Sequence, residues 1–366
     1  MVKPNILITV IVPTFNEVEN IDNFVINIRK VLKPYEFKIL FVDDNSKDGT
    51  IEKINKFKST SDDVDLIVRI GRRGLAGACI EGIHAAKSTY IAVIDCDLQH
   101  DEKLLVKMLD SFKETNDLDL IIGSRYVDKG ESKNGFSFIR DLCSKIAVKI
   151  TKKILKINAN DPMSGFFMAK KSSIQSSLHK LQPNGFKILV DILATCKGNL
   201  IIKELGYEFK KRQLGQSKMS FTVVLELIGL LVSHFTYGLI SMRFFLFGFV
   251  GSSGIFVQLF STYFFLKIIS FSFFYSQLFS ILIAMTSNYF LNNLITFKDH
   301  SLIGKSFLHG LFSFYIICSI GAFANIAIAE KLFNSSGIWY LASFSGAMVG
   351  ALWNFIFSSI FTWKTR

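Results

Sequence analysis

The sequence predicts an α/β domain with a mostly parallel sheet, followed by an amphipathic segment and an all-α membrane domain of four helices. Apolar, β-branched runs alternate with helical segments in the front of the chain. Charge is concentrated there as well, because only 7 of 42 Lys/Arg and 3 of 30 Asp/Glu lie from Met219 onward. We therefore expect a catalytic-type α/β domain over 1–218, an interface helix within 219–242 and a membrane domain over 243–366.

The front domain contains runs typical of strands and helices in alternating order. "ITVIVPTF", "KILFVDD" and "YIAVIDCD" have the composition of buried strands, whereas "EVENIDNFVINIRKVL" and "DGTIEKINKF" have helical periodicity. Polar clusters follow the three strands, at 13–17, 43–50 and 95–101. Since open α/β sheets bind ligands at the carboxyl ends of their strands, we expect these three loops to converge on one crevice.

The back of the chain contains four uncharged stretches, each long enough to span a bilayer, since about 20 apolar residues suffice. They are Phe244–Leu266, Ile268–Phe297, Ser306–Ala329 and Leu332–Trp363. The weaker segment 219–242 carries Glu226 and His234 and is expected to lie at the membrane interface, with a fifth span as the alternative.

The distribution of basic residues predicts the orientation in the membrane. With four spans, the front domain, Lys298, Lys305, Lys364 and Arg366 lie on one side, and Lys267 and Lys331 on the other. The positive-inside rule then places the front domain and the C-terminus in the cytoplasm. The short apolar run at the start, broken by Pro13, is not expected to be a signal peptide.

The membrane part contains a faint internal repeat. "NYFLNNLITFK" from Asn288 aligns with "NFIFSSIFTWK" from Asn354, and Gly254-Ile-Phe is echoed by Gly321-Ala-Phe. Duplicated helical hairpins would produce this pattern, although shared membrane-helix composition can also produce it.

Eight motifs in order resemble one known family. "PTFNE", "VDDNSKDGT", "RRGLAGACIEG", "DCDLQHD", "GSRY", "DPMSGFF", "GFKIL" and "GQSKMS" are similar to the polyprenyl-phosphate (dolichol-phosphate) mannosyltransferases of glycosyltransferase family two, which have a GT-A, Rossmann-like fold. The similarity covers nearly all of residues 1–220. The tail resembles the GtrA-like four-helix domain in "RFFLFGFVGSSGIF" and "SNYFLNNLITF".

The resemblance gives "DCDLQHD" a chemical role. A sugar nucleotide leaves as a diphosphate, so the site needs Mg²⁺ or Mn²⁺ held by oxygen ligands. Asp97 and Gln99 are expected to bind the metal, and Asp95 to hold the sugar or the groups around the metal. The alternative is that Asp95 and Asp97 only cap the next helix; since one side chain suffices for capping, His100 and Asp101 are assigned to that role.

The resemblance also implies a nucleotide-sugar site. Phe15 would pack on the base where the family commonly has Tyr, while Glu17 and Asp44 would accept hydrogen bonds from base N–H groups. Lys218 is also compatible with an exposed loop charge. The positions implied to contact the donor are Pro13, Phe15, Glu17, Val42, Asp44, Asp95, Cys96, Asp97, Lys187, Arg212 and Lys218.

The acceptor implied by the family is a polyprenyl phosphate. Because the second pKa of a phosphomonoester is about 6, the acceptor is already ionised and no general base is required. Arg125, Arg140 and Ser144 match the positions that dock this phosphate, and Asp95, Asp97 and Arg125 are the expected catalytic residues. A surface ion pair between Arg140 and Asp141 is the alternative for Arg140.

The predicted function is inverting, metal-dependent transfer of mannose from GDP-mannose to dolichyl or polyprenyl phosphate at the cytoplasmic membrane face. A UDP-hexose or UDP-N-acetylhexosamine donor is one alternative, and a lipid-linked-sugar translocator with a vestigial catalytic domain is another. A processive polysaccharide synthase is disfavoured because no QxxRW sequence is present. Membrane lipids are expected partners and nucleic acid is not; a homo-oligomer is left open. The five cysteines have no CxxC spacing and are expected to be reduced thiols.

Overall fold

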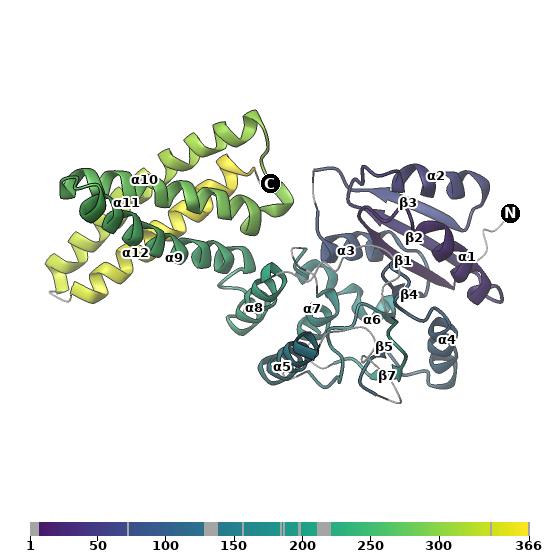
Figure 1. Cartoon of the computed structure of the whole chain (residues 1–366). Coiled ribbons are helices and arrows are strands. Elements are labelled where there is room, and N and C mark those ends of the chain that lie inside the picture. The colour runs from purple at the N-terminus through teal and green to yellow at the C-terminus, as the bar shows by residue number, and fades with distance from the viewer. Residues whose placement is uncertain are drawn as a thin grey trace. The chain divides into compact units, whose positions relative to one another are not determined.

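The computed structural model describes residues 7–71, 73–127, 138–155, 157–183, 185, 187–196, 199–210, 221–336 and 339–364. The chain forms two compact units, Met1–Leu239 and Ile240–Arg366, which are described separately (Figure 1).

A seven-stranded mixed sheet forms the centre of the first unit, with the strand order β3-β2-β1-β4-β6-β5-β7. β6 is antiparallel to both of its neighbours, β4 and β5, whereas the other neighbouring strands are parallel. This arrangement confirms the expected α/β fold with a mostly parallel sheet. The strands are β1 (Ile8–Thr14), β2 (Phe37–Asp43), β3 (Val64–Val68), β4 (Tyr90–Val93), β5 (Leu120–Ser124), β6 (Phe167–Lys170) and β7 (Ile202–Gly206).

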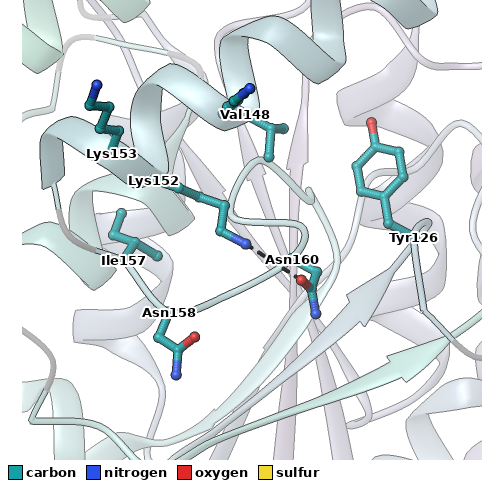
Figure 2. Close-up of a pocket in the computed structure, with 8 residues that line it drawn as sticks. Tyr126, Val148, Lys152, Lys153, Ile157, Asn158 and Asn160 are labelled. Carbon is teal, nitrogen blue, oxygen red and sulfur yellow. Dashed lines mark hydrogen bonds between the residues drawn. The ribbon is translucent and has the colours of Figure 1, made fainter.

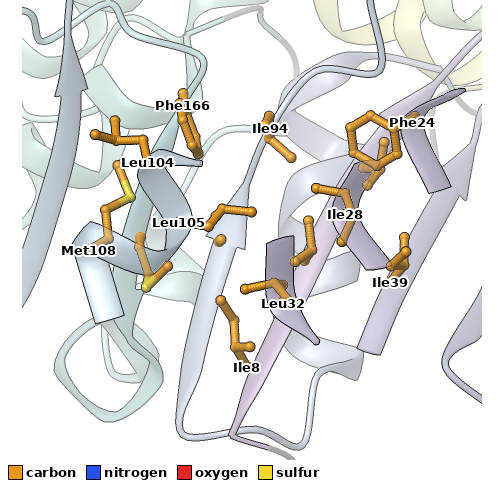
Figure 3. Packing of buried hydrophobic residues seen from close by; sticks show 14 of the residues in the cluster. Ile8, Phe24, Ile28, Leu32, Ile39, Ile94, Leu104, Leu105, Met108 and Phe166 are labelled. Atoms are coloured by element: carbon orange, nitrogen blue, oxygen red, sulfur yellow. The ribbon is translucent and has the colours of Figure 1, made fainter. Parts of the chain in front are cut away.

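Helices α1 (Ile21–Leu32) and α4 (Leu104–Glu114) cover one face of the sheet. The apolar stripe of α1, which includes Phe24 and Ile28, packs with Leu105 of α4 in a buried cluster (Figure 3). The strand residues in this cluster alternate along β1, as expected when one face of a strand is buried against helices. They include Ile8, Val10 and Val12.

Helix α3 (Leu75–Ala85) packs on the opposite face of the sheet. A Cβ atom on Gly82 would lie 2.5 Å from Cγ2 of Ile11 and 3.1 Å from Cγ2 of Val42. Ile11 alternates with Val10 and Val12 along β1, so it points away from α1 and α4. The missing side chain of Gly82 lets α3 approach the sheet closely.

The remaining helices of the first unit surround the sheet and its loops. Two of them, α5 and α8, pack against each other and belong to the same compact unit. The end of α8 is held by Gln182 Nε2, which donates to Ser233 Oγ at 2.6 Å, and by His234 Nε2, which lies 2.8 Å from Asp191 Oδ1. The helices are α2 (Thr50–Thr60), α5 (Phe138–Leu155), α6 (Lys171–Gln175), α7 (Ile188–Thr195) and α8 (Phe221–Phe235).

The second unit consists of four apolar helices, α9 (Met242–Tyr263), α10 (Phe273–Leu291), α11 (Lys305–Ser336) and α12 (Trp339–Phe357). Within the described residues, Met242–Ile268, Leu278–Thr296 and Lys305–Phe323 are long and apolar enough to cross a membrane. The described apolar part of the fourth helix is Met348–Thr362. The chain is therefore a membrane protein with the expected helical tail.

The faint repeat corresponds to two similar helical hairpins, α9–α10 and α11–α12. In the first hairpin, a Cβ atom on Gly254 would overlap the carboxamide of Asn288; in the second, a Cβ on Gly321 would overlap that of Asn354. Each hairpin therefore brings a glycine of its first helix against an asparagine of its second. Close backbone approach of this kind is typical of packed membrane helices.

The returning helix of each hairpin ends in a π-helical turn, 292–296 after α10 and 358–362 after α12. The residues that follow these turns, Phe297 and Trp363, stack on each other with ring centroids 4.2 Å apart. Trp363 Nε1 also donates to Asn293 Oδ1 at 2.9 Å. The two hairpins thus meet at equivalent positions of the repeat.

Candidate active site

The polar loops of the first unit gather at one edge of the sheet. β1, β2 and β4 are parallel, so the loops that follow them leave from the same edge. β5 and β7 run antiparallel to β6, which is itself antiparallel to β4, so their carboxyl ends lie at this edge as well. The expected convergence of loops is therefore present, and the loops after β5 and β7 join it.

The acidic sequence follows β4 in a tight turn. Leu98 adopts a left-handed backbone conformation with φ of 59°, and the Gln99 backbone N–H donates to Asp97 Oδ1 at 3.2 Å. Asp97 is only 6% exposed. Burial of a carboxylate in a polar turn, instead of in solvent, is typical of a binding site.

Gln99 is held by a second chain segment. Its Nε2 donates to the backbone carbonyl of Lys210 at 2.9 Å, and the backbone N–H of Lys210 donates to the Gln99 carbonyl at 3.0 Å. These bonds hold the amide nitrogen of Gln99 in place and so fix the orientation of its carboxamide. Lys210 is the last described residue before 211–220, the stretch of sequence that contains Arg212 and Lys218.

Asp95 lies against the loop that precedes β6. A Cβ atom on Gly165 would come within 2.9 Å of Asp95 Oδ2, so only glycine leaves room for this carboxylate. His100 Nε2 lies 3.6 Å from the same oxygen. Asp95, Asp97 and Gln99 thus emerge from one turn, and two of the three side chains are positioned by residues distant in sequence.

His100 was expected to cap the next helix, and this expectation was wrong. Its ring is 4% exposed, and its Nδ1 lies 2.7 Å from the Tyr207 hydroxyl. The ring also packs against Phe166 and Phe209, with centroid distances of 5.3 and 5.5 Å. Asp101 does have the expected structural role, because its Oδ1 accepts the Lys103 backbone N–H at 3.2 Å before α4 begins.

Asp44 follows β2 at the same edge of the sheet, and a buried arginine holds its side chain in place. Arg69, only 3% exposed, forms an ion pair with Asp44, and its Nε donates to Glu81 Oε1 at 2.9 Å. The Gly74 backbone N–H donates to Asp44 Oδ2 at 2.7 Å. Burial raises the pKa of the Asp44 carboxyl, while the Gly74 N–H and Arg69 oppose that rise.

The other residues expected around the base lie on the loops beside Asp44. Phe15 is partly exposed, and the Arg73 guanidinium lies 4.9 Å from the centre of its ring. Glu17 is positioned by its backbone N–H, which donates to Thr50 Oγ1 at 3.0 Å, and by Asn20 Nδ2, which donates to Glu17 Oε2 at 2.8 Å. Pro13 is half-buried within β1.

Two expected contact positions have buried side chains. Val42 is fully buried beneath α3, and Cys96 is 2% exposed in the core cluster. Burial, together with the negative charges of Glu17, Asp97 and Asp95, raises the pKa of the Cys96 thiol well above its ordinary value. Contact of either residue with a nucleotide would therefore involve backbone atoms.

Arg125 follows β5 and is held by Asp161. Its Nε and Nη2 donate to the two carboxylate oxygens at 2.8 and 2.7 Å, and its backbone N–H donates to Asp161 Oδ2 at 3.0 Å. Burial lowers the pKa of the Arg125 guanidinium, but the hydrogen bond and charge of Asp161 outweigh burial and raise it. The guanidinium also lies 5.7 Å from the Phe209 ring centre, so Arg125 and His100 pack on the same aromatic side chain.

The other expected site residues are only partly described. Arg140 and Ser144 both lie in α5, four positions apart and hence on one helix face, but their side chains lie outside the described residues. Lys187 precedes α7, and its Nζ donates to the Met163 carbonyl at 3.5 Å. Arg212 and Lys218 lie outside the described residues altogether.

Four residues of this site were not anticipated: Arg69, His100, Asp161 and Tyr207. Asp161 was visible in the sequence "DPMSGFF", and Arg69 as a charged residue directly after a strand. No local signal identified Tyr207, which meets His100 from 107 positions away.

The residues after β4 fit a hard divalent cation. A carboxylate oxygen from Asp97 and an amide oxygen from Gln99 are ligands that Mg²⁺ and Mn²⁺ accept. Among the described residues, no group of three or more His, Cys, Asp or Glu side chains could hold a metal ion. Two protein ligands are sufficient where substrate phosphates and water complete the coordination, as is usual for Mg²⁺.

Comparisons with known proteins agree with this architecture. Residues 9–178 match the model of glycosyl transferase family 2, and residues 246–363 match that of the GtrA/DPMS transmembrane domain. A dolichol-phosphate mannosyltransferase of Pyrococcus furiosus is 31% identical over 361 residues, covering 98% of this chain and 99% of the relative.

Two further similarities cover about three fifths of the chain. The dolichol-phosphate mannosyltransferase of Saccharomyces cerevisiae is 31% identical over 226 residues, covering 60% of this chain and 83% of its own length. A crystal structure of glucosyl-3-phosphoglycerate synthase from Mycobacterium tuberculosis, with Mg²⁺ and UDP, is 18% identical with a TM-score of 0.47 and covers 64% of this chain and 81% of its own.

The near full-length similarity confirms the resemblance inferred from the sequence motifs. The chain therefore belongs to the dolichol-phosphate mannosyltransferase family of glycosyltransferase family 2 enzymes and has a GtrA/DPMS transmembrane domain in its C-terminal part.

Proposed function

We propose that the enzyme transfers mannose from GDP-mannose to a dolichyl or polyprenyl phosphate, with inversion, at the cytoplasmic face of the membrane. The main support is the meeting of Asp95, Asp97 and Gln99 with the Arg125–Asp161 pair around the buried His100–Tyr207 contact. Relatives named dolichol-phosphate mannosyltransferase support the mannosyl donor and the lipid acceptor. The basic residues at one end of the membrane helices support the orientation.

The donor would bind along the loops after β1, β2 and β4. Glu17 and Asp44 are two carboxylates on neighbouring loops, and a carboxylate oxygen has more than one lone pair, so Asp44 retains acceptor capacity beyond Arg69 and Gly74. Guanine offers N–H donors on both its ring and its exocyclic amine, whereas uracil offers a single ring N–H. Two acceptor carboxylates therefore favour a guanine nucleotide.

The transfer itself needs positioning more than proton chemistry. An oxygen of the ionised acceptor phosphate attacks the anomeric carbon, the bond from that carbon to the diphosphate oxygen breaks, and GDP departs with the electron pair. Asp97 and Gln99 would hold Mg²⁺ or Mn²⁺, which offsets the charge developing on the leaving diphosphate. Asp95, placed by His100 and Gly165, would orient the sugar.

Arg125 would attract the acceptor phosphate from the opposite side of the anomeric carbon. Its bidentate bond to Asp161 fixes the guanidinium plane, so docking the phosphate costs little side-chain entropy. Arg140 and Ser144 on α5 are the further proposed phosphate contacts. This assignment rests on their sequence positions and their common helix face.

The test is incubation of the purified full-length chain with polyprenyl phosphate, Mn²⁺ and a panel of labelled nucleotide sugars. We expect label in the lipid fraction from GDP-mannose. Transfer from a UDP-hexose alone would replace the donor assignment, and donor hydrolysis without lipid labelling would contradict the proposed acceptor. Absence of any turnover by a chain that binds GDP would favour the translocator alternative.

A further inference from the structure

A basic pocket lies on α5, apart from the turn that carries Asp97. Its volume is about 610 Å³. It opens between the second half of α5 and the loop that follows, and Figure 2 shows Lys152 reaching toward Asn160, with Tyr126 on the far side. The lining residues are Tyr126, Val148, Lys149, Lys152, Lys153, Ile157, Asn158 and Asn160.

The lining carries three lysines and no acidic side chain. Lys152 Nζ donates to Asn160 Oδ1 at 3.4 Å, and Asn160 is itself held by Glu204 Oε2, which accepts its backbone N–H and Nδ2 at 2.8 Å each. Lys149 and Lys153 are exposed, and within the described part of the chain neither forms an ion pair. Glu204 thus fixes Asn160 in the pocket wall, and the exposed ammonium groups of Lys149 and Lys153 lie beside it. Such cationic groups are suited to binding a phosphate.

Exposed apolar side chains lie next to these lysines. Ile150 and Ile154 of α5 are 47% and 41% exposed, one helical turn apart. They occupy the face of α5 beside the Lys149–Lys153 stripe, since successive helix residues are separated by about 100°. A lysine stripe beside an apolar stripe is the pattern of a helix at a lipid–water interface.

α8 carries a second exposed apolar stripe. It packs against α5 and exposes Val224, Ile228 and Phe235, at 46%, 41% and 73%. These positions repeat at helical spacing and form one stripe. The helix ends at Phe235, and the first membrane-spanning helix begins at Met242. Only residues 236–241 separate α8 from α9 along the chain.

We propose that the pocket binds the headgroup phosphate of an anionic bilayer phospholipid, whose acyl chains lie over Ile150 and Ile154. The exposed apolar stripe decides for a lipid over a soluble phosphate, because a soluble anion would gain nothing from the isoleucines. The described lining of the pocket includes none of the proposed acceptor residues, Arg125, Arg140 and Ser144.

The pocket is lined by chain neighbours of the proposed acceptor arginine. Tyr126 and Asn160 line the pocket, and their chain neighbours Arg125 and Asp161 form the bidentate pair. A lipid bound at Tyr126 and Asn160 would thus contact the immediate chain neighbours of this pair. This proposal does not depend on the identity of the donor or the acceptor.

The test uses full-length protein in detergent micelles, with native mass spectrometry to count bound phosphatidylglycerol and phosphatidylcholine. The wild type should retain phosphatidylglycerol in preference to phosphatidylcholine. The variant K149Q/K152Q/K153Q should bind phosphatidylglycerol at least about tenfold more weakly, because three cations near one anionic headgroup are removed. A matched control, K30Q/K56Q/K107Q, removes three exposed lysines of α1, α2 and α4 and should bind like the wild type.

Other outcomes overturn the proposal. Unchanged phosphatidylglycerol binding by the α5 variant would remove the pocket from lipid binding. Complete displacement of the lipid by millimolar inorganic phosphate would identify a soluble-anion site instead. Displacement by polyprenyl phosphate, together with a raised acceptor KM, would assign the pocket to the acceptor.

Whether the α5 variant is correctly folded is checked separately. Wild-type GDP affinity in the α5 variant shows an intact domain, since none of the three lysines lies at the proposed donor site. Should that variant misfold, the single substitution Lys153→Gln at an exposed position should still lower phosphatidylglycerol binding by several-fold, and no change there would contradict the proposal.

Discussion

His100 connects the two halves of the site. Its ring lies between Asp95 Oδ2 on one side and the Tyr207 hydroxyl on the other, in a cage of Phe166 and Phe209. Such a buried side chain positions its neighbours, because a shift of the ring would move both the carboxylate and the hydroxyl. We therefore assign His100 as a positioning residue for Asp95.

Replacing His100 by Phe should lower kcat by about tenfold, with GDP affinity nearly unchanged. The aromatic packing is retained, but the polar contacts of the ring to Asp95 and to the buried Tyr207 hydroxyl are lost. The double variant H100F/Y207F should recover the midpoint of thermal unfolding without recovering kcat. Recovery of both the unfolding midpoint and kcat would show that His100 has only a structural role.

Asp97→Ala should reduce transfer to below about a tenth of wild type, because no other described side chain replaces its charge beside Gln99. Steady-state rates with saturating Mn²⁺ measure this. The matched control is Asp101→Ala, which removes only the contact to Lys103 N–H and should cost about 0.5–2 kcal/mol of stability while leaving the rate within about twofold. Equal rate losses in both variants would contradict the metal assignment.

At the scale of elements, the repeated hairpins of the membrane unit depend on glycine–asparagine contacts. Gly254 faces Asn288, and Gly321 faces Asn354. In each pair the second helix can approach only because the first lacks a side chain at that point. The carboxamide oxygens of Asn288 and Asn354 have no hydrogen-bond partner within the described residues, so close contact with the glycine backbone is the interaction left to them.

Gly254→Leu and Gly321→Leu should each destabilise the protein by about 1–3 kcal/mol, the usual cost of overpacking. Removing the facing carboxamide, as in G254L/N288A, should restore part of the loss, and G321L/N354A should behave alike. Thermal unfolding in detergent measures both pairs. Gly248→Leu is the control, because nothing within 4 Å would meet a Cβ there. Equal destabilisation by all three single substitutions would contradict these contacts.

At the scale of the whole molecule, the sequence predicted which segments form helices and strands better than it predicted which residues contact one another across the fold. The alternation of apolar runs and polar turns located β1, β2 and β4, and the uncharged stretches located the apolar helices α9 to α12 of the second unit. Strand β6 was not anticipated as antiparallel, because a strand of four residues carries no signal of its direction. Contacts across long separations were equally hidden, such as Arg69 with Asp44 and His100 with Tyr207.

The topology in the membrane can be tested with single cysteine probes. In sealed vesicles, Ser301→Cys should be labelled from the same side as Lys56→Cys in α2, because α9 and α10 form a returning hairpin. Ser335→Cys, at the end of the first helix of the second hairpin, should be labelled from the opposite side. Labelling of Lys56→Cys and Ser301→Cys from opposite sides would revive a fifth span within 219–242.

The central claim is a single in-line displacement at the anomeric carbon, with the lipid phosphate as the nucleophile. It is tested most directly by the anomeric configuration of the lipid product, measured by NMR after reaction of purified enzyme with GDP-α-mannose and polyprenyl phosphate. The account predicts a β-linked mannosyl phosphate carried by the polyprenol. An α-linked product would show net retention, through a double displacement or a same-face attack, and would contradict the single in-line displacement and the proposed roles of Asp95, Asp97 and Arg125.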